Sequence, residues 1–166
     1  MPIQKKVCLL GEFAVGKTSL VRRFVEGRFD DKYLSTIGVK ISRKEIQRPK
    51  DTLQLLLWDL AGGDDFSQVG GSYLRGAAGA LIVCDLTRRD TLRAFSYYSQ
   101  QLQTLHINPA LVIVGNKADL TAERTVTDQD LQNLVPGRDI PYILTSAKTG
   151  HGVENAFDLL AEQLSP

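Results

Sequence analysis

Runs of apolar residues alternate with segments of helical spacing along most of the chain. The apolar runs predict strands near residues 3–10, 39–47, 53–58, 79–85, 110–115 and 140–144. Apolar positions that repeat every three or four residues predict helices near 17–26, 67–75, 90–105, 127–135 and 152–163. This alternation of strands and helices is typical of a sheet that is covered by helices.

The strands are predicted to form a mostly parallel sheet. The runs Ala80-Leu81-Ile82-Val83-Cys84 and Leu111-Val112-Ile113-Val114 lack polar alternation, which indicates strands covered on both faces. Two extended runs meet at the turn-like Arg48-Pro49-Lys50-Asp51, so an antiparallel hairpin is expected over residues 39–58. The pattern therefore predicts one α/β domain over residues 1–166, with one antiparallel edge strand.

Composition limits the possible partners. Twenty basic and nineteen acidic residues leave a formal charge of +1, which gives no argument for nucleic acid or an anionic membrane. The apolar part of the N-terminal segment is shorter than a signal peptide needs, and no run of about 18 apolar residues is present to span a bilayer.

Cys8 and Cys84 lie in apolar runs, so buried reduced thiols in a cytoplasmic protein are expected; a disulfide or a reactive thiol is the alternative. Residues 160–166 contain no cysteine for prenylation, so membrane attachment is expected only through a lipidated tail outside this chain.

A phosphate-binding motif follows the first predicted strand. Gly11-Glu12-Phe13-Ala14-Val15-Gly16-Lys17-Thr18 matches G-x-x-x-x-G-K-S/T, and a helical segment comes directly after it. Glycines let backbone amides turn toward phosphate oxygens at the positive end of a helix. Lys17 is expected to reach the β- and γ-phosphates, and the Thr18 hydroxyl to bind Mg²⁺. A glycine-rich turn with a capping threonine is the alternative.

A second Mg²⁺ ligand is expected at the end of the strand near 53–58. Asp59 ends this apolar run, which places a carboxylate at the carboxyl edge of the sheet, where such folds bind ligands. Gly62, three residues later, supplies a backbone amide suited to a γ-phosphate. Taken alone, Asp59 is also compatible with a helix or turn cap.

Two further segments predict that the base is guanine. Asn116-Lys117-Ala118-Asp119 and Ser146-Ala147-Lys148 both follow apolar runs, on the edge where the phosphate loop lies. The Asp119 carboxylate can accept from the ring N–H and the exocyclic amine of guanine together, and adenine offers no such pair. The Ala147 amide is expected to meet the guanine carbonyl, and the Lys117 stem to cover one ring face. Without the phosphate loop, Asn-Lys-x-Asp is typical of an ordinary polar loop.

These motifs resemble those of the Ras superfamily, and within it most closely those of the Rab branch. The resemblance covers essentially the whole chain. It includes Tyr33-Leu34-Ser35-Thr36-Ile37-Gly38-Val39, Ser72-Tyr73-Leu74-Arg75-Gly76-Ala77, Thr145-Ser146-Ala147-Lys148-Thr149-Gly150 and Val153-Glu154-Asn155-Ala156-Phe157. It implies a P-loop NTPase fold with three α/β/α layers and a six-stranded, mostly parallel sheet.

The resemblance also implies a GTPase switch that uses GTP, GDP and Mg²⁺. The implied metal ligands are Thr18, Thr36 and Asp59, and the implied catalytic residues are Lys17, Thr36, Gly62 and Gly63. The nucleotide contacts would be Phe13, Ala14, Val15, Gly16, Lys17, Thr18, Ser19, Phe29, Thr36, Gly62, Asn116, Lys117, Asp119, Leu120, Ser146, Ala147 and Lys148. Phe29 would pack on the base, although a core aromatic is equally compatible with its spacing. Effector proteins would contact residues 33–48 and 60–76, with Trp58 as either an effector contact or a core aromatic.

Two positions depart from the family pattern. Small GTPases usually carry a glutamine after Asp-x-x-Gly to orient the attacking water, and here that residue is Gly63. Phe13 replaces a small residue where the arginine finger of an activating partner normally enters. We therefore expect slow intrinsic hydrolysis and a GTPase-activating or exchange factor of unusual type. Asp64, Asp65 and Gln68 are candidates for compensation, or are ordinary residues of a solvated loop.

Three functions fit the sequence: a slow GTPase switch, a GTP-binding module that is essentially non-hydrolysing, and another P-loop enzyme such as a kinase. A kinase needs an acceptor pocket and usually an arginine-rich lid, and the sequence indicates neither.

Overall fold

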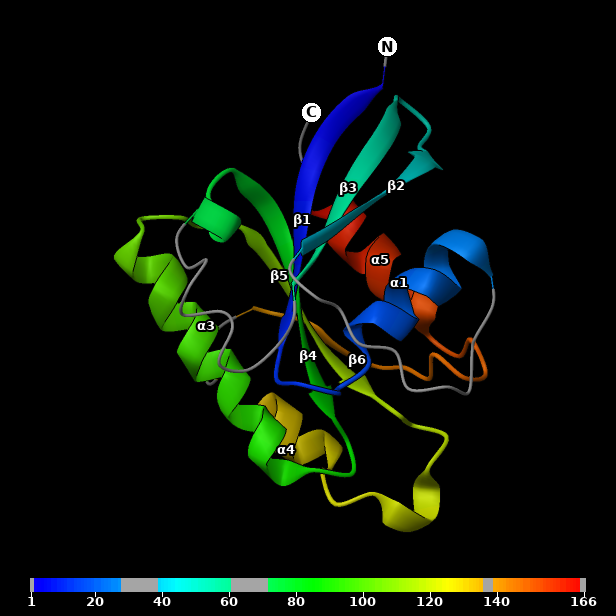
Figure 1. The fold of residues 1–166 in the computed structure, drawn as a ribbon, viewed down its shortest axis with the longest axis vertical. Helices are drawn as coiled ribbons and strands as arrows, with labels where there is room; N and C mark the ends of the chain where they lie inside the picture. The colour runs from blue at the N-terminus through cyan, green and yellow to red at the C-terminus, as the bar shows by residue number, and fades with distance from the viewer. Residues whose placement is uncertain (1, 28–38, 61–71, 136–138, 165–166) are drawn as a thin grey trace.

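The computed structural model describes residues 2–27, 39–60, 72–135 and 139–164 (Figure 1). Its strands are β1 (Ile3–Gly11), β2 (Val39–Gln47), β3 (Thr52–Leu60), β4 (Ala77–Asp85), β5 (Ala110–Asn116) and β6 (Tyr142–Leu144). Its α-helices are α1 (Lys17–Glu26), α3 (Arg93–Thr104), α4 (Asp128–Gln132) and α5 (Val153–Glu162), with short 3-10 turns at Arg89–Leu92 and Thr121–Glu123. The predicted element order is confirmed within these ranges. Of the predicted helix 67–75, residues 72–74 are helical and residues 67–71 lie outside the described ranges.

The six strands form one sheet in the order β2-β3-β1-β4-β5-β6. Strand β1 pairs parallel with β3 and β4, and β5 pairs parallel with β4 and β6. Strand β2 pairs antiparallel with β3, from Val39 opposite Leu60 to Gln47 opposite Thr52. The predicted six-stranded, mostly parallel sheet with one antiparallel edge strand is therefore confirmed.

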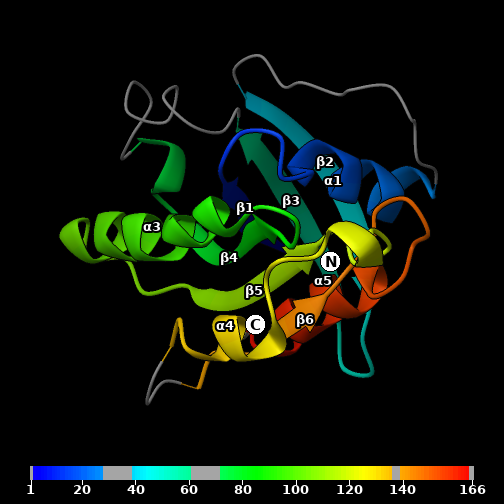
Figure 2. The same cartoon turned by 90° about the horizontal axis from the view of Figure 1, so that it is seen from below.

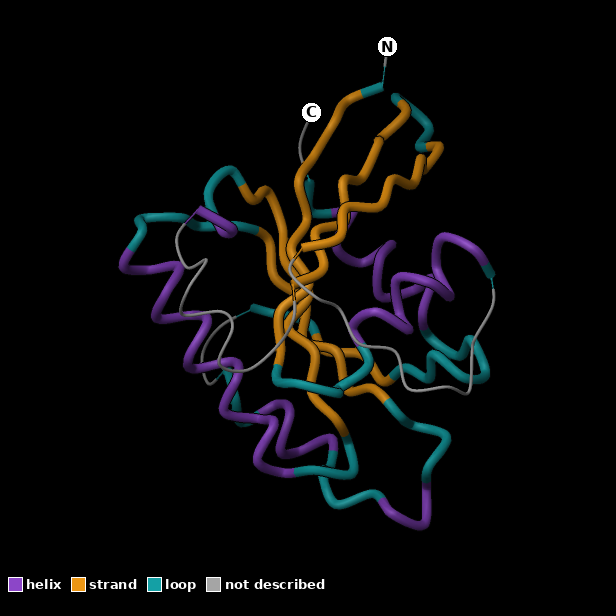
Figure 3. Tube along the Cα trace, viewed as in Figure 1, coloured by secondary structure: helices purple, strands orange, loops and turns teal. Residues whose placement is uncertain are grey.

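The sheet is the middle of three layers. Figures 1 and 3 show α1 and α5 on one side of the sheet and α3 and α4 on the other. Successive strand residues point to opposite faces, so β1 sends Val7 and Leu9 into the core under α1 and α5. The same strand sends Cys8 and Leu10 into the second core under α3. This two-sided burial explains why the central strands carry apolar residues at consecutive positions.

The buried thiols match the expectation from the sequence. Cys8 and Cys84 are both free and buried. Burial raises the pKa of each thiol to about 12, so the neutral form is favoured at physiological pH.

The β2–β3 hairpin is fastened at its turn. The Arg48 guanidinium makes two hydrogen bonds with the Asp51 carboxylate, at 2.5 and 2.7 Å. It also donates to the carbonyls of Ala161 and Leu164, beside the end of α5. The hydrogen bond from Arg48 N to Asp51 O, at 2.8 Å, closes the turn that the sequence predicted.

Two predicted elements are shorter than expected. The segment 127–135 forms α4 over Asp128–Gln132 only, with Thr127 and Asp130 closing a capping box at its start. The predicted strand 140–144 is confined to β6, Tyr142–Leu144. Pro141 has no N–H to give to a strand ladder, which limits how early β6 can begin. Among the helices of the described ranges, none combines the length and the apolar character that crossing a membrane requires.

Candidate functional site

The polar residues singled out in the sequence gather at one edge of the sheet. Strands β3, β1, β4, β5 and β6 run parallel, so their carboxyl ends lie together, at the edge toward which Figure 2 looks. Leu9 of β1 lies opposite Asp59, and Asp85 of β4 lies opposite Asn116. The loop of residues 12–16 connects β1 to α1 at this same edge. The sheet topology thus produces the juxtaposition that the motif spacing predicted.

Residues 11–18 form the candidate phosphate loop. The Lys17 ammonium is 7% exposed and donates to the carbonyls of Gly11, at 3.0 Å, and Glu12, at 3.3 Å. Burial lowers the pKa of Lys17 to about 8, against the opposite effect of the Asp59 and Glu12 carboxylates. The loop therefore holds a largely desolvated cation at the start of α1, where the helix dipole also favours an anion.

Gly16 occupies a position that only glycine fits. Its φ is +105°, and a Cβ built on it would lie 2.3 Å from Asn116 Nδ2. We expect Gly16→Ala to lower nucleotide affinity at least about tenfold, because the strained backbone and the clash both displace the loop. Titration of a fluorescent GDP analogue measures the effect. Gly27→Ala is the matched control, since Gly27 also has a positive φ but has nothing within 4 Å of its Cβ direction. Equal affinities for Gly16→Ala and Gly27→Ala would contradict this interpretation.

The two described Mg²⁺ candidates lie against each other. The Thr18 hydroxyl donates to Asp59 Oδ2 at 2.6 Å, and the Asp59 carboxylate is 2% exposed. A buried carboxylate beside a hydroxyl offers the oxygen ligands that Mg²⁺ prefers, and Mg²⁺ usually takes few protein ligands and keeps several waters. The residues present therefore fit Mg²⁺ held jointly with phosphate oxygens.

Asn116 and Lys117 connect the end of β5 to the phosphate loop. Asn116 Nδ2 donates to the carbonyl of Val15 at 3.0 Å, and its Oδ1 accepts from the Thr145 hydroxyl at 3.0 Å. Lys117 Nζ donates to the carbonyl of Ala14 at 3.1 Å. Ala14 and Lys117 both have positive φ, +63° and +71°, which is uncommon for residues with a side chain. Such strain is typical of functional sites, where surrounding contacts hold the backbone in place.

Asp119 and the segment 146–148 lie together, as the guanine prediction requires. The Ser146 hydroxyl donates to Asp119 Oδ1 at 2.8 Å, which orients the carboxylate. Arg23 of α1 donates through Nε to the carbonyl of Ala147 at 2.9 Å and through a terminal nitrogen to that of Lys148. Asp119 is therefore held by Ser146, and the segment 147–148 is held by α1.

Some predicted site residues are not among those described. Phe29, Thr36, Gly62 and Gly63 lie outside the described ranges, as do Asp64, Asp65 and Gln68. The described parts of the two predicted effector segments are 39–48 and 72–76, together with Leu60. Of the remaining predicted contacts, Ser19 lies in the first turn of α1, and Leu120 is an exposed residue after β5.

Phe13 and Trp58 differ in burial. The Phe13 side chain is 53% exposed at the rim of the phosphate loop, as the crowding argument requires. Trp58 is half-buried, with the Lys6 ammonium 3.7 Å above its ring and Tyr73 edge-on at 6.0 Å. Both sequence interpretations of Trp58 remain compatible with this position, because one part of the ring packs on the core and another stays accessible.

Sequence reasoning missed three side chains at this edge: Arg23, Asp85 and Arg88. Asp85 ends the apolar run of β4 just as Asp59 ends that of β3, so the same argument could have found it. Arg88 donates to the carbonyl of Phe13 at 3.0 Å, and Arg23 holds the segment 147–148. No sequence pattern distinguishes an arginine that binds a distant carbonyl from one that only faces solvent, so the partners of Arg23 and Arg88 are seen only in the fold.

Comparison with known proteins agrees with this geometry. The Ras family model matches residues 6–165. The chain is 37% identical over 160 residues to Ras-related protein Rab-4A of Danio rerio, and the match covers 96% of this chain and 75% of that protein. The chain therefore belongs to the Ras family and is a Rab-like small GTPase.

Proposed function

We propose that this chain is a guanine-nucleotide switch that binds GTP or GDP with Mg²⁺, hydrolyses GTP slowly and presents two switch segments to effector proteins. The convergence of four features carries the proposal. Lys17 and the Thr18–Asp59 pair would form the phosphate end of the site, and Asn116 and the Asp119–Ser146 pair would form the base end, as their contacts support. These features lie at or next to the phosphate loop and the strand ends at the same edge of the sheet, so one bound nucleotide would contact all of them.

Recognition of the base would rest on Asp119. Its carboxylate, oriented by Ser146, would accept from the ring N–H and exocyclic amine of guanine. The Ala147 amide would donate to the guanine carbonyl, and the Lys117 stem would cover one face of the ring. Phe29 stays a predicted contact on the other face.

At the phosphate end, Lys17 would turn from the Gly11 and Glu12 carbonyls to the β- and γ-phosphates. Thr18 and Asp59 would hold Mg²⁺, which neutralises developing phosphate charge when it is bound. Thr36 and Gly62 would engage only the triphosphate form, so that hydrolysis releases both switch segments. Effectors are proposed to contact residues 33–48 and 60–76, of which β2 presents exposed Val39 and Ile41.

Slow turnover is proposed from Gly63 and Phe13. Glycine has no side chain to orient the attacking water, and the exposed Phe13 ring stands where an activating arginine normally enters. Any activating or exchange factor would then have to be of an unusual type. A non-hydrolysing interaction module is the second candidate, favoured by the same two residues, and it differs in keeping bound GTP for many hours.

Replacing Gly63 by glutamine should raise the single-turnover rate of GTP hydrolysis about tenfold, because the side chain orients the attacking water. We expect the wild-type rate to lie below about 10⁻⁴ per second, and Gly27→Gln serves as a control glycine that ends α1. A wild-type rate equal to that of ordinary small GTPases, or no gain in Gly63→Gln, would overturn the slow-turnover proposal. No detectable cleavage in either protein would favour the non-hydrolysing module.

The cellular setting stays a prediction. Reduced buried cysteines favour the cytoplasm, the near-zero net charge gives no reason to expect nucleic acid, and membrane attachment would need a lipidated tail outside this chain. The single nucleotide-binding domain over residues 1–166 is likewise a proposal.

A further inference from the structure

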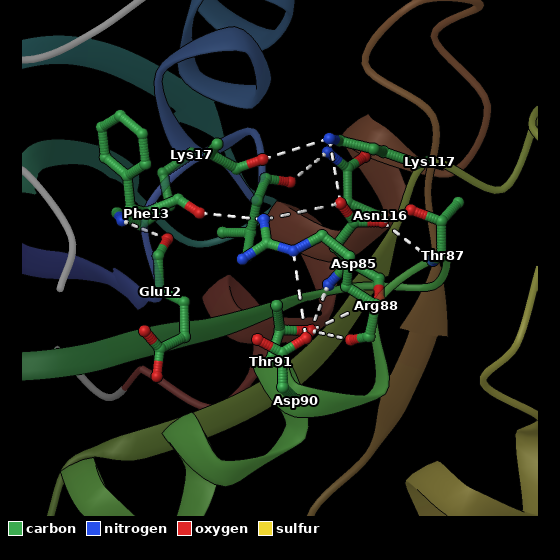
Figure 4. A network of polar contacts seen from close by, with 12 residues as sticks. Glu12, Phe13, Lys17, Asp85, Thr87, Arg88, Asp90, Thr91, Asn116 and Lys117 are labelled. Atoms are coloured by element: carbon green, nitrogen blue, oxygen red, sulfur yellow. Dashed lines mark hydrogen bonds and ion pairs between the residues drawn. The ribbon is translucent and has the colours of Figure 1, made fainter.

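Arg88 reaches from the turn after β4 to the outer side of the phosphate loop (Figure 4). Its backbone is fixed by its N–H to the Asp85 carbonyl, at 2.9 Å, and by its carbonyl, which accepts from Thr91 N and Thr91 Oγ1. From this fixed base the guanidinium donates to the carbonyl of Phe13 at 3.0 Å. The loop residue that departs from the family pattern is therefore held by an arginine of the same chain.

A single buried carboxylate stands behind this contact. Asp85 is 0% exposed, and its Oδ1 accepts from Thr87 N, at 2.8 Å, and Thr87 Oγ1, at 2.6 Å. Its Oδ2 lies 2.9 Å from Lys117 Nζ and 3.9 Å from a terminal nitrogen of Arg88. Both cations thus share one anion, and each also donates to the phosphate loop (Figure 4).

Three consecutive loop carbonyls are held by side chains from the ends of β4 and β5. Arg88 holds the carbonyl of Phe13, Lys117 that of Ala14 and Asn116 that of Val15. In a planar trans peptide the N–H points away from the carbonyl of the same peptide unit. Holding these carbonyls therefore turns the amides of residues 14, 15 and 16 toward the opposite side of the loop, where the motif is expected to bind phosphate.

The Phe13–Ala14 peptide is the one most in need of such a contact. Ala14 has a φ of +63°, a left-handed value that a residue with a Cβ adopts only at a cost. A flip of this peptide would relieve the strain and turn the Ala14 amide away from the phosphates. The charge-assisted hydrogen bond from Arg88 opposes the flip, because a flipped peptide has no carbonyl on that side.

We propose that Arg88 is a positioning residue for nucleotide binding: it keeps the Ala14 amide directed at the phosphates of GDP and GTP before they bind. The inference rests on the proposed guanine-nucleotide function. A loop ordered in advance does not have to be ordered by the ligand, so loss of Arg88 weakens phosphate binding without removing any group that touches the nucleotide.

The test compares Arg88→Ala and Arg88→Lys with Arg89→Ala. Arg89 is the adjacent arginine, and it pairs with Asp130 of α4 instead of the loop. Dissociation of a fluorescent GDP analogue is measured in excess GDP with Mg²⁺, and the ³¹P resonance of the β-phosphorus of bound GDP is recorded for each protein. Far-UV circular dichroism verifies that each variant is folded.

We expect Arg88→Ala to release GDP about tenfold faster and to shift the β-phosphorus resonance, as loss of one charge-assisted contact implies. Arg88→Lys should recover part of both effects, and Arg89→Ala should match the wild type. Wild-type protein that binds no GDP would refute the proposed function itself. Wild-type protein that binds GDP, with an unchanged release rate in Arg88→Ala or with faster release but an unmoved resonance, would overturn the positioning role alone.

Discussion

Replacing Asp119 by asparagine is expected to lower the affinity for GDP about 10⁴-fold and to create affinity for xanthosine diphosphate. The carboxylate can accept two hydrogen bonds from guanine, whereas the asparagine amide presents a donor to the exocyclic amine and leaves both groups unsatisfied. Xanthine carries an oxygen where guanine carries the amine, so the asparagine amide fits it. Displacement of a fluorescent analogue by GDP, xanthosine diphosphate and ADP measures the change.

Asp139→Asn is the matched control, because Asp139 is an exposed carboxylate that precedes β6 and is not among the predicted nucleotide contacts. It should leave the preference for GDP unchanged. Retention of tight GDP binding by Asp119→Asn, without a gain for the xanthine nucleotide, would mean that Asp119 does not read the base.

Replacing Lys17 by alanine should weaken binding of GTP about 10³-fold, the second largest effect we expect. The ammonium would make charge-assisted contacts with two phosphates from a site that is shielded from water, and each such contact contributes about 1.5–3 kcal/mol. Its removal also deletes the hydrogen bonds to the Gly11 and Glu12 carbonyls in the free protein, where Gly11 keeps the hydrogen bond from the Tyr98 hydroxyl. Competition between GTP and the fluorescent analogue measures the loss.

Lys50→Ala provides the comparison for Lys17, since Lys50 is an exposed lysine in the β2–β3 turn. It tests whether loss of one positive charge anywhere on the chain lowers affinity. Equal losses in the two variants would show that general charge, and not the placement of Lys17, attracts the nucleotide.

Most of the architecture could be predicted because its signals are local. The apolar runs of β4 and β5 have no polar alternation, which only a sheet covered on both faces explains. The turn at 48–51 was equally readable, and the structure places the Arg48–Asp51 pair in it. Short elements were less accurate: α4 already ends at Gln132, and β6 begins only at Tyr142, after Pro141, and hydrophobic periodicity registers neither limit.

The site residues likewise divide into those with local sequence signals and those without them. Motif residues such as Lys17, Thr18 and Asn116 were predicted because fixed spacing places the first two at the start of α1 and Asn116 at the end of β5. Arg88 and Arg23 were missed because their role is set by carbonyls 75 and 124 residues away in the sequence. Long-range contacts to backbone atoms leave no trace in residue type, since every residue offers a carbonyl.

The proposed slow GTP hydrolysis rests on two residues, Phe13 and Gly63, and the support for each is of a different kind. Phe13 lies in the described loop, where its side chain is exposed and Arg88 holds its carbonyl, and its proposed effect on an incoming arginine rests on that exposure. Gly63 has no side chain that could orient the attacking water, and this is known from the sequence alone. With the proposed slow hydrolysis at Gly63, we expect a long-lived GTP state.

Loading the purified protein with GTP and following the bound nucleotide by chromatography tests the central claim most directly. The protein is loaded in the presence of Mg²⁺, freed of unbound nucleotide, and denatured at intervals over many hours. The account predicts about one guanine nucleotide per chain, recovered first as GTP and converted slowly to GDP, with a Gly63→Gln sample converting faster. Recovery of no guanine nucleotide, or tighter retention of ATP than of GTP, would contradict it.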